Sequence, residues 1–139
     1  LNAQTAALGL SHSEVRRKMM DFSSRSRGIE NFTTAEDMAI FLEKLYHGQM
    51  LAEEARDTCL ESLKNQRIND RIPARLPSGT IVAHKTGLER GVCHDVGIIF
   101  APYADFLVVV LTKGVKTSKP AKEFIASVAA HVYNYWDGS

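Results

Sequence analysis

The chain has 139 residues, of which 45% are apolar, and this is enough for one domain with its own hydrophobic core. Its 17 basic and 16 acidic side chains give a formal charge of +1 and are spread along the sequence, which argues against nucleic acid or an anionic membrane as a partner. No apolar run approaches the roughly 20 residues that a membrane-spanning helix needs. The first residue is a leucine with no signal peptide before it, so we expect either that an upstream part has been removed or that the boundary was chosen by design.

Residues 1–66 follow helical spacing. A helix is expected to begin at Thr33 or Thr34, because an acidic side chain lies three residues after each, and to end at Gly48. A second helix is expected after Leu51 and before the polar segment 65–70. The apolar residues expected to face inward are Met38, Phe41, Leu42 and Leu45 in the first helix and Ala55, Cys59, Leu60 and Leu63 in the second.

Three β-rich runs follow, at 80–86, 96–100 and 106–112, the last containing the stretch LVVVL. Their short connections favour a three-stranded antiparallel meander. A final helix is expected to start near Lys119-Pro120 and to cover one face of this sheet. Its apolar stripe consists of Ile125, Val128, Ala129, Val132, Tyr133 and Trp136. The chain therefore reads as a single domain over residues 1–139, mostly helical over 1–79 and made of three strands and a helix over 80–139.

The two cysteines, Cys59 and Cys93, do not define a disulfide framework, and we expect both to be buried as small apolar residues. His84, Cys93, His94 and Asp95 lie close enough in sequence to raise the question of a metal site. They lack the paired spacing of a metal motif, and His84 alternates away from Lys85 on a strand. We therefore expect neither a metal nor another cofactor.

Lys85, Thr86 and Gly87 end the first β-rich run. An ammonium and a hydroxyl next to a glycine form an anion-binding edge, because glycine lets a ligand approach the backbone and the amide of Leu88 can point into the same space. Such an edge suits a substrate carboxylate and a developing oxyanion. The tripeptide alone also fits an ordinary exposed strand end with a turn glycine, so its neighbours must decide between the two.

The neighbouring sequence, from Gln66 through Pro77 to HKTGLERGVCHDVGIIFAP, resembles class A β-lactamases and related penicillin-recognising serine hydrolases. The segment TTAEDMAIFLEKLYHGQML, the third β-rich run and the final helix ending in tryptophan are similar to the same family, in collinear order over nearly the whole chain. The resemblance implies an α/β (α+β) chain that forms the C-terminal part of the β-lactamase-like fold. It also implies that Lys85, Thr86 and Gly87 bind the substrate carboxylate and border the oxyanion hole, with the backbone amide of Leu88 as one oxyanion donor.

Two motifs that the resemblance would require are absent from these 139 residues. No Ser-x-x-Lys, which holds the family's nucleophile, and no Ser-Asp-Asn occurs in the sequence. The resemblance places Leu1-Asn2 about where the helix after Ser-Asp-Asn would start. We therefore expect the nucleophile, its lysine and the second serine to belong to a missing N-terminal part, and this chain to be inactive alone.

The segment from Arg17 to Thr34 has the length of the family's Arg-x-Glu-x-x-x-Asn loop, whose glutamate and asparagine position the deacylating water. Arg17 fits the arginine, but Met19 stands at the glutamate position and Ser23 at the asparagine position. A thioether cannot take a proton from water, so general-base deacylation has no carrier at Met19. Asp21 is a nearby carboxylate that could replace it.

The family also holds the substrate carboxylate with an arginine. Many relatives supply it from the second strand of the meander, where the resemblance places Val96 in this chain, and some from the loop before the Lys-Thr-Gly strand, where this chain has Arg71. Arginine can grip a carboxylate with two hydrogen bonds, so Arg71 is a candidate binding residue. A solvated loop arginine is the alternative reading.

Three functional classes remain open on the sequence. The chain can be the substrate-binding part of a serine β-lactamase-like hydrolase that acts through an acyl-serine intermediate on β-lactams or related amides and esters. It can belong to a D-alanyl-D-alanine peptidase-like or esterase-like relative, which Met19 favours, or be a non-catalytic binding module. The expected partners are a β-lactam or peptidoglycan-like small molecule and, through the unpaired LVVVL strand, a second copy or the missing half. By resemblance, the parent protein is expected to work outside the cytoplasm.

Overall fold

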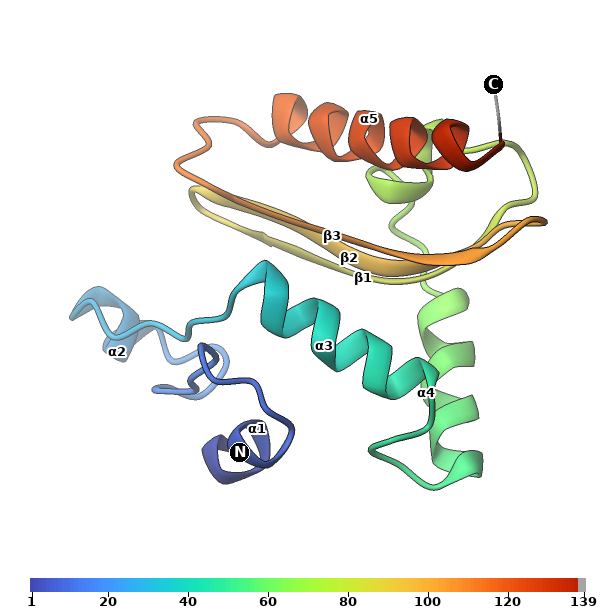
Figure 1. Cartoon of the computed structure of the whole chain (residues 1–139). Coiled ribbons are helices and arrows are strands. Elements are labelled where there is room, and N and C mark those ends of the chain that lie inside the picture. The colour runs from blue at the N-terminus through green and yellow to red at the C-terminus, as the bar shows by residue number, and fades with distance from the viewer. Residues whose placement is uncertain (138–139) are drawn as a thin grey trace.

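The structure is a computed structural model that describes residues 1–137. A three-stranded sheet lies between helices on its two faces, with α5 above it and α3 below it in the view of Figure 1. The strands are β1 (Ile81–Glu89), β2 (Val92–Phe100) and β3 (Asp105–Lys113), and they pair antiparallel in the order β1-β2-β3. The predicted α/β (α+β) class and three-stranded meander are therefore confirmed.

The first hairpin is tighter than the sequence indicated. We expected β1 to end at Thr86, stopped by Gly87, and β2 to begin at Val96, but pairing continues until Glu89 lies opposite Val92. Only Arg90 and Gly91 remain in the turn, and Gly91 has φ of 82°, a value that glycine adopts without steric cost. Gly87 is thus an interior strand residue, and the Lys-Thr-Gly segment is held by β2 along its whole length.

The main core lies between the sheet and α5 (Ser118–Asp137). The predicted stripe of α5 packs onto the sheet through Ile125, Ala129 and Tyr133, which are at most 6% exposed. Trp136, which we placed in the same stripe, is 59% exposed because it lies in the last turn, beyond the edge of the packed core. No helix within residues 1–137 is long and apolar enough to cross a membrane.

The opposite face of the sheet is covered by α3 (Ala35–Tyr46), with α4 (Glu53–Lys64) running away from it near β1 (Figure 1). The Thr34 hydroxyl accepts a hydrogen bond from the Asp37 amide, so the predicted helix start is confirmed. Leu42 and Leu45 of α3 are buried as expected.

The prediction for α4 is correct in its bounds but wrong in its inward face, because no residue of this helix is buried. Ala55 and Cys59 are exposed, and Leu60 and Leu63 are only half-buried. Cys59 is therefore not the buried residue we expected, whereas Cys93 is fully buried. The spacing on α4 is that of a packed helix, yet within the described residues its apolar side has little to pack against.

The N-terminal region holds two short helices, α1 (Asn2–Ala7) and α2 (Phe22–Ser26), and lies at one end of α3 (Figure 1). The segment around α2 closes on itself: Glu14 and Phe32 form an isolated antiparallel bridge, and Arg17 pairs with Glu30 at 2.7 Å. This closed loop contains Met19 and Asp21. A short 3-10 helix, η1 (Ile72–Arg75), precedes β1 and packs against α5.

Candidate functional site

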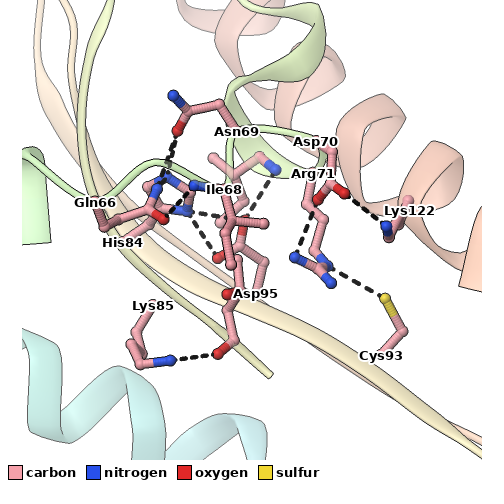
Figure 2. Close-up of polar contacts among 12 residues, drawn as sticks. Gln66, Ile68, Asn69, Asp70, Arg71, His84, Lys85, Cys93, Asp95 and Lys122 are labelled. Carbon is pink, nitrogen blue, oxygen red and sulfur yellow. Dashed lines mark hydrogen bonds and ion pairs between the residues drawn. The ribbon is translucent and has the colours of Figure 1, made fainter. Parts of the chain in front are cut away.

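Lys85 lies on β1, an outer strand of the sheet. Within the described residues β1 pairs only with β2, so its other edge is open. The Lys85 side chain is exposed on the side of the strand that faces α3, and its ammonium donates a hydrogen bond to the carbonyl oxygen of Thr86 at 2.7 Å (Figure 2). The partner of this ammonium is thus a local backbone carbonyl. An anionic ligand at the edge could take the place of that carbonyl.

Thr86 and Leu88 lie on the opposite face from Lys85, because side chains alternate along a strand. Thr86 and Leu88 therefore do not share a face with Lys85, and the Lys85 ammonium and the Thr86 hydroxyl can converge on one ligand only at the open edge of β1. Gly87 carries no side chain at this edge, and Leu88 is 53% exposed. This arrangement leaves the backbone of 85–88 accessible from outside the sheet.

The side chain of Arg71 is buried against Cys93 of β2 and does not lie on the surface of the loop. This side chain is 2% exposed; Nε donates to Cys93 Sγ at 3.3 Å, and Nη1 lies 3.0 Å from Asp70 Oδ1. The reading of a solvated loop arginine is therefore wrong. Within the described residues Nη1 makes no hydrogen bond of good geometry, although it is close to Asp70. Nη1 is therefore ion-paired with Asp70 and retains a spare N–H.

A buried polar cluster joins this loop to the Lys-Thr-Gly strand (Figure 2). The ring of His84, 1% exposed, contacts the Asp95 carboxylate through Nδ1 at 2.9 and 3.0 Å. Its Nε2 contacts the side chains of Gln66 and Asn69 in the loop after α4. Asp95 is fully buried and also accepts the Ile72 amide at 3.0 Å. The prediction that His84 faces away from Lys85 is confirmed by this placement.

The second strand contributes nothing cationic next to Lys85. Val96 lies directly opposite Lys85, and His94 lies opposite Gly87. Burial lowers the pKa of His94, the nearby Arg71 guanidinium lowers it further, and a hydrogen bond with Cys93 opposes these effects. His94 Nδ1 accepts the Thr112 amide at 3.0 Å, which also favours the neutral ring. Over residues 1–137 no group of three or more histidine, cysteine or acidic side chains is arranged to hold a metal ion.

Met19 and Asp21 lie in the loop around α2, and the structure shows their surroundings. Met19 is 76% exposed, and the next residue, Met20, has φ of 65°, the left-handed conformation that non-glycine residues seldom adopt. Asp21 caps α2: Oδ1 accepts the Ser24 amide at 2.9 Å and Oδ2 accepts the Ser24 hydroxyl at 2.6 Å. These two bonds from Ser24 hold the pKa of Asp21 below its usual range, and Arg27 and Arg17 act in the same direction. A carboxylate of lowered pKa with both oxygens occupied is a poor general base.

The sequence did not identify the His84–Asp95 pair, which we considered only as part of a metal site. A signal was available, since both are polar residues at inward positions of two paired strands, where apolar side chains are the rule. Their exact pairing was not predictable, because the hairpin between them was expected to be longer. Thr86, rather than His84, is the direct cross-strand neighbour of Asp95.

Comparison with known proteins agrees with this architecture. A model of the Beta-lactamase enzyme family matches residues 1–136. Beta-lactamase VEB-1 from Pseudomonas aeruginosa is 28% identical over 118 residues, which cover 77% of this chain and 40% of that protein. The chain therefore spans less than half the length of this curated relative.

Two solved structures extend the comparison. The crystal structure of a serine-to-glycine variant of TLA-1 extended spectrum beta-lactamase superposes with a TM-score of 0.89 at 23% identity, covering 96% of this chain and 52% of that one. The structure of a leucine-to-glutamate variant of PBP-A, an acyl-enzyme complex with penicillin G, gives a TM-score of 0.87 at 26% identity over 99% of this chain and 51% of that one. Since the family match covers nearly all of the sequence and the fold agrees, the chain belongs to the Beta-lactamase enzyme family.

Proposed function

We propose that this chain is the carboxylate-binding part of a serine β-lactamase-like hydrolase that acts through an acyl-serine intermediate on β-lactams or related amides and esters. The observation that carries the proposal is Lys85-Thr86-Gly87 at the open edge of β1, in a chain that matches the family from residue 1 to 136. Family membership makes hydrolysis the expected chemistry, and an exposed ammonium at an accessible backbone edge suits an anionic substrate.

In this proposal Lys85, Thr86 and Gly87 bind the substrate carboxylate, and the backbone amide of Leu88 donates to the oxyanion that forms as the acyl bond is attacked. Arg71 contributes positive charge from behind the strand. Its guanidinium is buried and ion-paired with Asp70 at 3.0 Å, so only the part of its charge that Asp70 does not offset acts on the site. The acylated nucleophile would be a serine of a Ser-x-x-Lys motif, which these 139 residues do not contain.

The missing motifs imply that the active protein is longer and that this chain alone is inactive. The relatives support this, since the chain covers about half of their length. The direct test is nitrocefin hydrolysis by the purified chain, for which we expect no turnover. Saturable hydrolysis by the purified chain would refute its assignment as an inactive part, and hydrolysis that is unchanged in the Lys85→Ala variant would also refute the assignment of the site.

A second candidate function, a penicillin-binding or D-alanyl-D-alanine peptidase-like enzyme that deacylates slowly, is favoured by the loop around α2. Met19 cannot act as a base, and Asp21 is occupied as the cap of α2. PBP-A supports this alternative, because its leucine-to-glutamate variant, 26% identical to this chain, is an acyl-enzyme complex with penicillin G. Benzylpenicillin trapping distinguishes the two: a long-lived adduct supports the slow enzyme, and rapid release supports a β-lactamase. A non-catalytic binding module would form no adduct.

The outer edge of β3 is a candidate surface for binding a protein partner. Within the described residues β3 is unpaired on its outer side, although it contains the apolar stretch LVVVL. Such an edge can add a further strand. We propose that it pairs with the missing half of the protein, or with a second copy when that half is absent. The nature of the substrate also leads us to propose a site of action outside the cytoplasm for the whole protein.

A further inference from the structure

His84 and Asp95 differ from the other polar residues of the sheet in their burial. Asp95 is 0% exposed and His84 1%, and both lie on the face of the sheet that packs toward η1 and α5. Burying a carboxylate is costly unless hydrogen bonds and opposite charge compensate it. The fold supplies that compensation here through two specific donors, so the cluster has a defined geometry.

One of those donors comes from the strand that carries Lys85, and the other from the loop that carries Arg71. One is the ring of His84, the residue immediately before Lys85. The other is the backbone amide of Ile72, the residue immediately after Arg71. One carboxylate therefore ties the lysine-bearing strand to the arginine-bearing loop (Figure 2).

The neighbouring contacts restrict this arrangement further. Cys93, two residues before Asp95 on the same face of β2, accepts the Nε–H of Arg71 at 3.3 Å. Gly97, two residues after Asp95, lies so close to β1 that a Cβ there would come 2.6 Å from the Cβ of His84. These contacts fix the distance between the loop that carries Arg71 and the two strands. The spare N–H of Arg71 Nη1 is buried on the face of the sheet that carries Cys93.

We propose that His84 and Asp95 are positioning residues for carboxylate recognition. Asp95 fixes the Ile72 backbone, and through it the guanidinium of Arg71, relative to β1. His84 contacts the same carboxylate and also the side chains of Gln66 and Asn69. These contacts attach the segment between α4 and η1 to β1 at the residue next to Lys85. The inference rests on the proposed function, because it specifies how that site selects substrates that carry a carboxylate.

The test compares Asp95→Ala and Asp95→Asn in the longer protein that the proposed function requires. The readout is the ratio of acylation rate constants for benzylpenicillin and for its methyl ester, which lacks the negative charge. We expect Asp95→Ala to lower this ratio about tenfold, the effect of losing hydrogen bonds to a charged group. Asp95→Asn should recover part of it, because an amide oxygen still accepts from Ile72. A purely structural role would slow both substrates equally and leave the ratio unchanged.

Asp105→Asn is the matched control. Asp105 begins β3, away from Lys85, and accepts the hydroxyl of Tyr46 at 2.7 Å. We expect this variant to keep the unmodified ratio. A normal ratio in both Asp95 variants, with acylation intact, would overturn the inference and leave the proposed function standing.

A second measurement on this 139-residue chain separates the two failures. Amide resonances of residues 85–88 and hydrogen exchange at Ile72 report positioning without any chemistry. We expect Asp95→Ala to shift the former and accelerate the latter, and Asp105→Asn to change neither. If the longer protein does not acylate, the proposed function fails, and unchanged amides at 85–88 and Ile72 would refute the positioning role on their own.

Discussion

Gly97 provides the sharpest structural prediction, because a side chain at this position of β2 would collide with β1. A Cβ at this position would lie 2.6 Å from His84 Cβ and 2.9 Å from the carbonyl oxygen of Ala83. Neither atom moves when the His84 side chain rotates, because the backbone fixes the positions of both. The Gly97→Ala variant must therefore displace β1 directly beside Lys85.

The cost follows from two opposing effects. Overpacking of this kind costs about 1–3 kcal/mol. Alanine restricts the unfolded chain, which returns about 0.5–1 kcal/mol at a position with ordinary backbone angles. We expect a net loss of about 1–2 kcal/mol in the free energy of unfolding.

The assay is urea denaturation of the chain followed by circular dichroism. Gly87→Ala is the matched control, because Gly87 is also an interior strand glycine, but the three atoms nearest to its added Cβ all belong to the His94 side chain, at 3.3 Å or more, and none is a backbone atom. We expect Gly87→Ala to change stability by less than about 0.5 kcal/mol. Equal stability of the two variants would refute the close approach of His84 and Gly97.

Three further predictions follow from the loop, the buried histidine and the sheet edge. In the longer protein, Met19→Glu restores a general base and should raise the deacylation rate at least about tenfold, whereas Met19→Gln, which cannot take a proton, should not; equal rates would refute the assignment of Met19. Because the pKa of His94 is lowered in the folded state, the unfolded chain binds more protons below the ordinary value of about 6.5, so stability should fall as pH drops through that range. Urea titrations at pH 5 to 7 should find this dependence weaker in His94→Gln, and an unchanged dependence would exclude His94 as its source. Finally, the chain should self-associate in sedimentation velocity with rising concentration, and Leu111→Lys on β3 should weaken this; a clean monomer at high concentration would count against strand-edge pairing.

The sequence predicted the elements better than their packing. Thr34 identified the start of α3 because helix capping is a local interaction between the residue and the next turn. The same periodicity failed for α4, where Ala55 and Cys59 were expected inward and are exposed. Helical spacing indicates that a face is built for packing, but it does not say whether the partner is within the chain.

The site was predictable only in part for a similar reason. The Lys85-Thr86-Gly87 segment was found from a local motif, but the structure places it inside β1, whereas we expected it at the end of the strand. Arg71 was named as a candidate ligand, but its burial against Cys93 depends on a contact between residues 22 positions apart. The His84–Asp95 cluster likewise depends on strand register, which the underestimated length of the hairpin concealed. Non-local pairing of this kind leaves little trace in the sequence.

The central claim is that this chain is one half of an acylating site. It is tested most directly by producing the chain and the upstream part of the same protein separately, mixing them, and detecting a benzylpenicillin adduct by intact-protein mass spectrometry. We predict an adduct on the upstream partner that forms rapidly only when this chain is present, and that forms more slowly with the Lys85→Ala variant. An adduct on the 139-residue chain itself, or equally fast acylation of the upstream part alone, would contradict the claim.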